Sequence, residues 1–400
     1  MIYALTLAVT LIMIGTHGYG LFLFGAILPD LQVKYGFDYA FIGTASATLQ
    51  VAYMCGALLL GLAGNRLPAR YWLTGSTVCC GALMLLLRLN HSPDLMLAAF
   101  ALLGAFSAIS WSSAVGVING CLPLGRRGLI LTIGASGGSW GMLSIGVLTD
   151  YGRALFAPED LWVLGSGFAL LGLLILAPFL RRSAANTAPS AHAASVAGMH
   201  GWTLEQKRVA GLAIVLSGLV GATAIPFTTY LSTYLIGEVG RAQKVASSVW
   251  QVLGVTGAMS GVLIGAIADR MDHRKIIIAT FLAFAAASWF LAWAPTSSAI
   301  ALAGIGHGVA LNPFWGLLAA YIGTFFPPTA TMRIDALGLV AFGLFSAMAN
   351  WSIGQWATTG GSLGTVYMLL GGAILTMATL VLTAPRPRSH PVALPSRKTP

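Results

Sequence analysis

Apolar residues are gathered into twelve long runs, separated by short segments that carry most of the charged residues. A helix rises 1.5 Å per residue, so each run is long enough to cross a hydrocarbon core of about 30 Å. The ten-residue alternating segments of a transmembrane barrel do not stand out. The pattern therefore predicts an all-α membrane protein with twelve transmembrane helices. They are expected at residues 5–29, 40–64, 71–89, 95–120, 128–149, 161–180, 209–235, 245–268, 276–294, 299–325, 334–359 and 365–384.

Composition supports this interpretation and excludes others. Hydrophobic residues make up 57% of the chain and charged residues 8%, whereas an ordinary soluble protein is roughly 25% charged. The net charge of +10 does not indicate a nucleic-acid partner, because the basic residues lie in gaps between apolar runs and form no groove. The four cysteines lie inside or at the ends of runs, so no disulfide framework is expected. We expect neither a metal nor a cofactor.

The basic residues also predict an orientation. Sixteen Lys and Arg follow even-numbered runs or lie in the tail, and five lie on the opposite side, which accounts for all 21. Basic residues favour the cytoplasmic side, so both termini are expected there, in a multi-pass protein of the cell inner (plasma) membrane. The five residues expected outside are Lys34, Arg88, Arg153, Arg241 and Lys244.

A short segment recurs in the two halves of the chain. Gly61, Asn65, Arg66 and Arg70 follow the second run, and Gly265, Asp269, Arg270 and Arg274 follow the eighth. The offset of 204 residues also carries the start of the first run to the start of the seventh. A parallel duplication is therefore predicted. We expect an N-terminal six-helix bundle at 1–180, a cytoplasmic linker at 181–208, a C-terminal bundle at 209–384 and a disordered cytoplasmic tail at 385–400.

The paired segments resemble the loop signature G-x-x-x-D-R-x-G-R-R/K of the major facilitator superfamily, with Asn65 and Pro68 departing from it in the first copy. The resemblance implies two pseudo-symmetric bundles joined by a linker, which transport solutes by alternating access. It also implies a conformational lock between the halves, formed by Asn65, Arg66, Arg70, Asp269, Arg270 and Arg274. The helix-4 Arg and helix-5 Pro of the family's drug/proton antiporters are missing, which lowers the expectation of multidrug efflux.

The centre of the membrane is where this architecture places its cargo site. No Asp, Glu, Lys or Arg lies in the central part of any run. His17, flanked by Gly15, Gly18 and Gly20, is the leading candidate for proton coupling and for binding cargo, and His307 is the second for proton coupling. Imidazole titrates near neutral pH, so either ring could bind and release a proton during transport. The alternative for His17 is a neutral ring hydrogen-bonded to another helix, and the alternative for His307, nearer the external end of its run, is a ring that simply meets water.

Polar and aromatic residues near the centre are candidates for binding the substrate. Tyr19, Trp111, Trp140, Asn312 and Asn350 belong to this group. Pro313 should kink its helix beside Asn312, as Pro226 should kink the seventh. Four further polar residues lie within runs, but one sequence does not assign the direction they face: Gln50, Tyr53, Asn119 and Gln251. The glycines of the fifth and eighth runs predict close helix packing.

These features favour a secondary transporter for a small organic solute, with a monocarboxylate as one candidate and protonation of His17 as the coupling step. No phosphate-binding loop and no catalytic constellation is present in the sequence, so an enzyme is not expected. The expected partners are the solute, membrane lipid and protons, and the chain is expected to be a monomer. Two alternatives stay open: a non-transporting membrane sensor on the same scaffold, and a drug or metabolite efflux antiporter.

Overall fold

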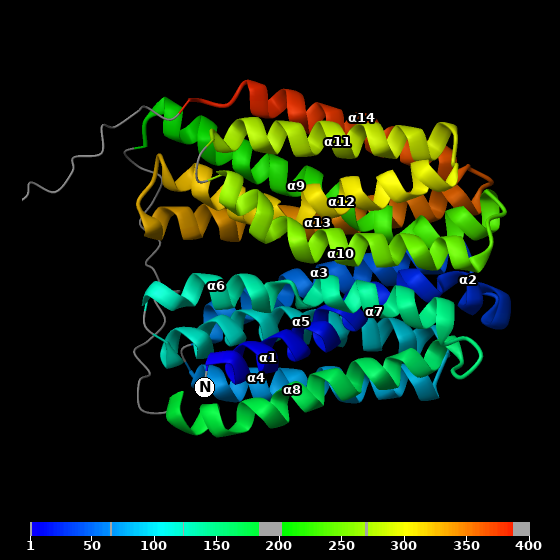
Figure 1. Ribbon diagram of the computed structural model, residues 1–400, viewed down its shortest axis with the longest axis horizontal. Coiled ribbons are helices and arrows are strands. Elements are labelled where there is room, and N and C mark those ends of the chain that lie inside the picture. Colours follow the sequence, from blue (N-terminus) through cyan, green and yellow to red (C-terminus); the bar gives the residue numbers. More distant parts are fainter. Residues whose placement is uncertain (1, 65, 123, 184–201, 269–270, 387–400) are drawn as a thin grey trace, which may run out of the picture.

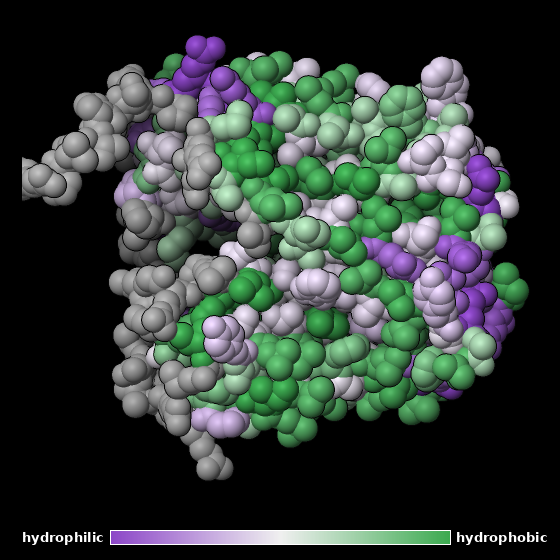
Figure 2. Space-filling model, viewed as in Figure 1, coloured by the Kyte–Doolittle hydropathy of each residue, from purple (hydrophilic) through white to green (hydrophobic). Residues whose placement is uncertain are grey.

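The computed structural model describes residues 2–64, 66–122, 124–183, 202–268 and 271–386. Within these ranges, twelve helices are long and apolar enough to cross a membrane, as the sequence predicts. They form two stacked six-helix bundles, the N-terminal half in blue to green and the C-terminal half in green to red (Figure 1). Apolar residues cover the middle of the face seen in Figure 2, and hydrophilic residues gather toward its ends. This distribution suits a lipid-embedded bundle.

The elements follow the chain in the order that the apolar runs predict. The N-terminal half contains α1 (Ile2–Met13), η1 (Ile14–Phe22), α2 (Leu23–Tyr35), α3 (Tyr39–Ala63), α4 (Ala69–Leu89), α5 (Pro93–Cys121), α6 (Leu124–Ala135), α7 (Gly137–Tyr151), η2 (Pro158–Asp160) and α8 (Leu161–Ser183). The C-terminal half contains α9 (Leu204–Thr233), η3 (Tyr234–Glu238), α10 (Gln243–Ala268), α11 (His273–Trp293), α12 (Ser297–Gly323), α13 (Pro328–Thr358) and α14 (Leu363–Leu382).

The first membrane span is longer than its apolar run predicts. It continues through Pro29 to Tyr35, because Leu28 and Leu31 extend its buried face. It ends at Gly36, whose φ of 70° and N–H bond to the Gln32 carbonyl make a left-handed helix cap. The expected end at residue 29 is therefore wrong. A proline deprives a helix of one hydrogen bond, but strong packing on both sides of it can keep the helix intact.

Two other boundaries differ from the sequence-based expectation. The fifth span is divided at Ser136 into α6 and α7, beside glycines that are poor helix formers. Residues 204–208, expected in the linker, form the first turn of α9. Thr203 accepts from the Gln206 amide and Gln206 accepts from the Thr203 amide, which is the capping box that the sequence predicts. The predicted linker residues 184–201 and tail residues 387–400 lie outside the described ranges.

The two halves are packed most closely toward one end. We call the end that carries Ile2, Ser183 and Leu204 the linker end, and the opposite end the far end. Near the far end, a Cβ on Gly43 of α3 would lie 2.6 Å from the Asn350 carbonyl oxygen of α13. A Cβ on Gly146 of α7 would lie 2.8 Å from the Ser247 carbonyl oxygen of α10.

Toward the linker end the surface between the halves is hollowed (Figure 2). The bundles are thus joined at the far end and separated at the linker end. This is a conformation open toward the linker end, as expected for one state of an alternating-access protein.

Candidate functional site

A π-helix interrupts the first membrane span at its centre. The nine residues of η1, Ile14–Phe22, contain three glycines and His17. A run of π-helix is uncommon and is frequent at functional sites, because it widens the helix and redirects its side chains. Here it places His17 next to α3 and α7, at the depth where the sequence analysis expects the cargo site.

Both nitrogens of the half-buried His17 ring face hydroxyl groups. Nδ1 lies 3.0 Å from Thr16 Oγ1, and Nε2 lies 3.4 Å from the Tyr53 hydroxyl of α3. The His17 and Tyr53 rings meet edge to face, with centroids 5.9 Å apart. Thr16 in turn donates to the Ile12 carbonyl at 2.9 Å. The ring therefore sits in a short chain of hydrogen-bonding groups that could accommodate either its neutral or its protonated form.

Close backbone packing holds η1 in place. A Cβ on Gly15 would lie 2.6 Å from the Gly165 carbonyl oxygen of α8, and one on Gly18 would lie 2.5 Å from Gly141 Cα of α7. Neither position leaves room for a side chain without movement of the backbone. The same glycines that the sequence places around His17 thus bring two neighbouring helices against it.

One contact between the two halves lies close to His17. Gly138 of α7 has His17 Cβ as its nearest neighbour on the side where a Cβ would lie, at 3.8 Å. The next residue, the buried Ser139, donates to Asn312 Oδ1 of α12 at 3.3 Å. A Cβ on Gly257 of α10 would lie 2.5 Å from Asn312 Nδ2, so the Asn312 amide fills the space between α7 and α10. The predicted candidate Asn312 therefore lies at the interface between the halves.

A small cavity of about 20 Å³ lies at the same interface, near the volume that one water needs. Leu21 and Phe22 of η1 and Gln50 of α3 line it on one side, and Thr228 of α9 and Trp250 of α10 on the other. Leu21 is one turn beyond His17 toward the far end, and Gln50 is about one turn beyond Tyr53 in the same direction. The His17–Tyr53 pair therefore lies next to this cavity on its linker side.

Asn350, another predicted candidate, is completely buried in α13. Its Nδ2 donates to the Ser346 carbonyl at 2.9 Å, and its own carbonyl accepts from the Tyr230 hydroxyl at 2.8 Å. Its side-chain oxygen has no hydrogen-bond partner among the described residues. A buried acceptor without a partner is unfavourable. Asn350 Oδ1 is therefore available to accept a hydrogen bond when the two halves rearrange.

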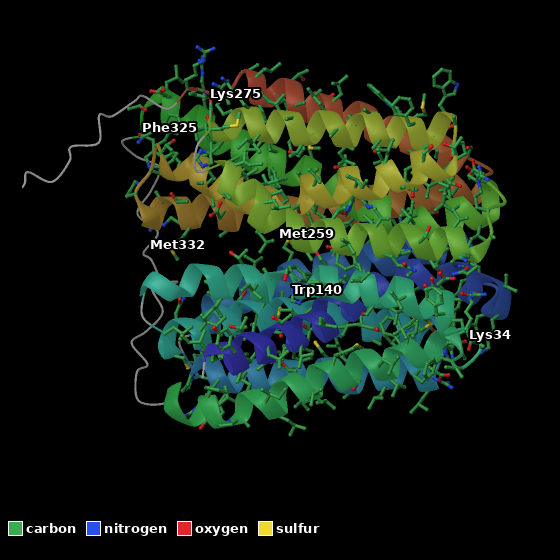
Figure 3. The ribbon with its side chains drawn as sticks, in the orientation of Figure 1. Lys34, Trp140, Met259, Lys275, Phe325 and Met332 are labelled. Carbon is green, nitrogen blue, oxygen red and sulfur yellow. The ribbon has the colours of Figure 1, made fainter. Side chains whose placement is uncertain are left out.

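Three aromatic candidates lie away from His17. Tyr19 is fully buried inside the N-terminal half, where Ser144 donates to its hydroxyl at 3.1 Å. Trp111 packs on an apolar cluster of α1, α4, α5 and α8. Trp140 is 44% exposed and lines an open, largely apolar groove of about 530 Å³ between the first span and α7. Figure 3 shows Trp140 and Met259 of α10 at the boundary between the halves.

His307, the second histidine candidate, is 1% exposed in the C-terminal half. Its Nε2 lies 3.3 Å from the Ala224 carbonyl of α9. Its ring stacks on Phe227 with centroids 5.1 Å apart and meets Phe284 edge to face. Since a carbonyl only accepts, Nε2 carries the proton. This is the arrangement of a hydrogen-bonded packing histidine, and its burial does not fit the alternative of a ring that simply meets water.

The predicted conformational lock is described only in part, because Asn65, Asp269 and Arg270 lie outside the described residues. Arg66 is exposed. Arg70 donates to the Leu180 carbonyl at the end of α8, and Arg274 donates to the Val381 and Leu382 carbonyls at the end of α14.

These two equivalent arginines therefore cap the last helix of their own halves, where a cation suits the helix dipole. In this open state they hold each half together at the linker end, and these bonds do not cross to the other half.

Sequence reasoning assigned no role to Thr16, Tyr53 or Ser139. Tyr53 is recognisable as a polar residue within a span, but only its contact with His17 in the folded chain shows which way it faces. Thr16 and Ser139 are small hydroxyl residues of a kind that is common inside membrane helices. Their positions beside His17 and Asn312 follow from the π-helix and from close glycine packing, and neither has a sequence signature of its own.

Comparisons with known proteins identify the family and the fold. A family model described as Major Facilitator Superfamily matches residues 10–331. The chain therefore belongs to this superfamily of membrane transporters and is a twelve-helix secondary transporter. Its membership confirms the resemblance that the repeated loop segments indicate.

Solved transporters share the whole fold at low sequence identity. The xylose transporter XylE from E. coli, in an inward-open conformation, matches with a TM-score of 0.76 and 15% identity, covering 97% of both chains. A D-xylose-proton symporter matches with a TM-score of 0.74 and 14% identity, and the nucleoside transporter NupG with 0.73 and 17%; each comparison covers 96% of this chain and 98% of the other.

A curated relative, the mouse glucose-6-phosphate exchanger SLC37A1, is 31% identical over 125 residues. The matched segment spans 30% of this chain and 22% of that relative's length.

Proposed function

We propose that the protein is a proton-coupled transporter of a small organic solute that carries at most one negative charge. The observation that carries this proposal is the position of His17. It lies in a π-helix at the centre of a membrane span, faces two hydroxyl groups and is next to the interface between the halves. Protonation of His17 would supply one positive charge in a low-dielectric region, where an anion and a proton favour each other's binding.

The chemistry of the surrounding groups limits the solute. Tyr53, Ser139 and Asn312 offer neutral donors and acceptors, as binding a sugar, a nucleoside or a monocarboxylate requires. Lys34 lies at the far end and Lys275 at the linker end (Figure 3). A dianionic phosphate ester would need fixed cations near the centre, and the sequence has no Lys or Arg in the central part of any span. We therefore favour solutes of the kinds named for XylE and NupG, or a monocarboxylate, over a sugar phosphate.

His17 is a better coupling residue than His307. His307 is enclosed by Phe227 and Phe284, and its proton is directed at a carbonyl. Losing or gaining a proton there would break that bond or bury a charge among aromatic rings, and both are unfavourable. His17 is half-buried and its neighbours are hydroxyls, which can reverse between donating and accepting.

The test begins with thermal-shift measurements on the purified chain with D-xylose, uridine, L-lactate and glucose 6-phosphate. Solutes that stabilise it are then assayed in proteoliposomes with an imposed pH gradient. We expect binding by a neutral or singly charged solute, and pH-driven accumulation that His17→Gln abolishes while downhill exchange is partly retained. Preferential binding of glucose 6-phosphate would overturn the charge limit. Full pH dependence in both His17→Gln and its double variant with His307→Gln would overturn histidine coupling.

We also propose that both termini are cytoplasmic, with the bundle boundaries near residues 180 and 209. Single cysteines at Ser92 and Ala191, in a background without native cysteines, should react with an impermeant thiol reagent from opposite sides. Labelling of both from one side would contradict this orientation.

A further inference from the structure

The hydrogen-bond chain through His17 has two possible directions, and they do not satisfy the same number of groups. In the first, the Tyr53 hydroxyl donates to Nε2, Nδ1 donates to Thr16 Oγ1, and Thr16 donates to the Ile12 carbonyl. In the second, Thr16 donates to Nδ1, Nε2 donates to Tyr53, and the Tyr53 proton must find another acceptor. Tyr53 has no other hydrogen-bond acceptor among the described residues. The first direction therefore contains one more bond.

We propose that Tyr53 is a solute-binding residue whose hydroxyl becomes free to donate a hydrogen bond to the solute when His17 is protonated. This rests on the proposed function and deepens it. With His17 neutral, the Tyr53 proton is held on Nε2. With His17 protonated, both ring nitrogens must donate, so Tyr53 accepts from Nε2 and its own proton turns away from the ring.

The solute feature that this switch recognises is a hydrogen-bond acceptor oxygen. The Tyr53 hydroxyl is polarised by the hydrogen bond that it accepts from the imidazolium of His17. Hydrogen bonds that involve an ionised group are stronger than those between neutral groups. A carboxylate is therefore the best partner and a neutral carbonyl or hydroxyl a weaker one. The solute needs no direct contact with His17, because both of its ring protons are used by Thr16 and Tyr53.

This arrangement couples the solute to the proton through one hydroxyl group. A solute acceptor competes with neutral His17 for the Tyr53 proton, but it does not compete with protonated His17. Binding of the solute therefore favours protonation, and protonation favours the solute by the same factor, as linkage requires.

Other titratable groups packed around η1 are neutral and engaged elsewhere. The Tyr19 hydroxyl of η1 accepts from Ser144 of α7, and Cys80 of α4 lies 3.8 Å from Ser107 of α5. Ser107 itself donates to the Thr16 carbonyl at 2.8 Å, which fixes the backbone of the residue that pairs with His17. The central parts of α7 and α8, which also pack against η1, contain no acidic or basic residue.

The tautomer of His17 tests the switch without any solute. The full chain is labelled with ¹⁵N-histidine, and the His17 signals are identified by their loss in His17→Gln. At alkaline pH we expect the proton on Nδ1. Thr16→Val removes the acceptor for that proton and leaves one bond in either direction, so the preference for Nδ1 should be lost and part of the signal should report a proton on Nε2. Tyr53→Phe should leave the proton on Nδ1. Thr10→Val is the matched control, because Thr10 makes the same bond to a carbonyl four residues earlier but does not contact His17.

The second measurement follows Tyr53 itself, labelled with ¹³C at the ring carbon that bears the hydroxyl. Its signal should shift when His17 is protonated, as the hydroxyl changes from donor to acceptor toward the ring, and it should not shift in His17→Gln. A proton on Nε2 in the unmodified chain at alkaline pH, or a Tyr53 signal that ignores His17, would overturn the switch. Neither readout depends on transport, so absence of transport for all four solutes would count against the proposed function and leave the switch to be judged separately.

Discussion

The two halves share one architecture but use their polar residues differently. At the far end of the N-terminal half, ion pairs join different segments of the chain: Lys34 with Glu159 at 2.7 Å, Arg88 with Asp160, and Arg153 with Asp30. At the far end of the C-terminal half, charged side chains bind the backbone. Glu238 accepts from the Leu363 and Gly364 amides at the start of α14, and Arg241 donates to the Pro295 carbonyl at 2.6 Å.

The histidines differ in the same way. His17 faces hydroxyl groups that can reverse their hydrogen bonds, whereas His307 faces a carbonyl that cannot. The duplication therefore preserved the packing but not the chemistry. We infer that the N-terminal half carries the titratable part of the site, and that the C-terminal half contributes fixed hydrogen-bonding groups such as Asn312.

The largest expected effect in a test of this difference concerns the two histidines. His307→Ala should lower the free energy of unfolding by about 2–5 kcal/mol, the range for replacing a large buried side chain by alanine. His17→Ala should cost about 1 kcal/mol, since its partners are hydroxyls that can bond elsewhere. Denaturant or thermal unfolding of the two variants measures the difference. Equal destabilisation would mean that His17 is also a packing residue.

A second prediction concerns the far-end contact between the halves. Gly43→Ala places a methyl group against the Asn350 carbonyl oxygen and Gly354 Cα, both of which are backbone. Overpacking of this kind costs about 1–3 kcal/mol, so the closed far end should lose population by about 5- to 150-fold.

Distance measurements between spin labels at Ser92 and Ser298 should then show an additional population in which the two labels are farther apart. Gly167→Ala is the control, because a Cβ there has open space around it. An unchanged distance distribution in Gly43→Ala would show that this contact does not hold the halves together.

Most of the fold could be predicted from the sequence, because apolar runs of membrane-spanning length can form little other than transmembrane helices. The repeat after the second and eighth runs also predicts the equivalence of Arg70 and Arg274, which bind equivalent helix ends. The lengthened first span could not be predicted, because its continuation through Pro29 depends on packing of Leu28 and Leu31 against other helices.

The site was predictable only in part. His17 and Asn312 stand out because polar residues are scarce at the centre of the membrane. The π-helix coincides with the close approach of Gly15 and Gly18 to α8 and α7, and no local pattern gives its position. The direction of Tyr53 and the distinction between the two histidines depend on contacts between helices that are far apart in the chain. The sequence does not show these contacts, so it predicts both histidines as candidates for proton coupling.

The third prediction compares the two arginine caps. Arg274 is buried and makes two bonds to the end of α14, so Arg274→Met should cost about 1–3 kcal/mol of stability. Arg70 is more exposed and makes one long bond of 3.4 Å to the end of α8. Arg70→Met should therefore cost less than about 1 kcal/mol. Thermal unfolding measures both, and a reversed order would show that the two repeats do not use this arginine in the same way.

The smallest effect concerns the pH dependence of the N-terminal far end. His91, in the loop between α4 and α5, stacks on Tyr35 with ring centroids 4.3 Å apart. Burial lowers the pKa of His91 below its ordinary value of 6.5; nearby Glu159 opposes this, and Lys34 and Arg88 add to it. Because the folded-state pKa is the lower one, neutral His91 contributes stability that is fully present above pH 6.5 and is lost as the pH falls through the folded-state value.

The unmodified chain should therefore lose more thermal stability than His91→Gln as the pH falls below 6.5, because the folded-state pKa of His91 is the lower one. Glutamine has no proton to gain there, so subtracting its curve removes the contribution of carboxylates such as Glu159. If His91→Gln loses as much thermal stability on acidification as the unmodified chain, the stacked histidine makes no pH-dependent contribution to stability. The far ends of the two halves would then differ only in their ion pairs.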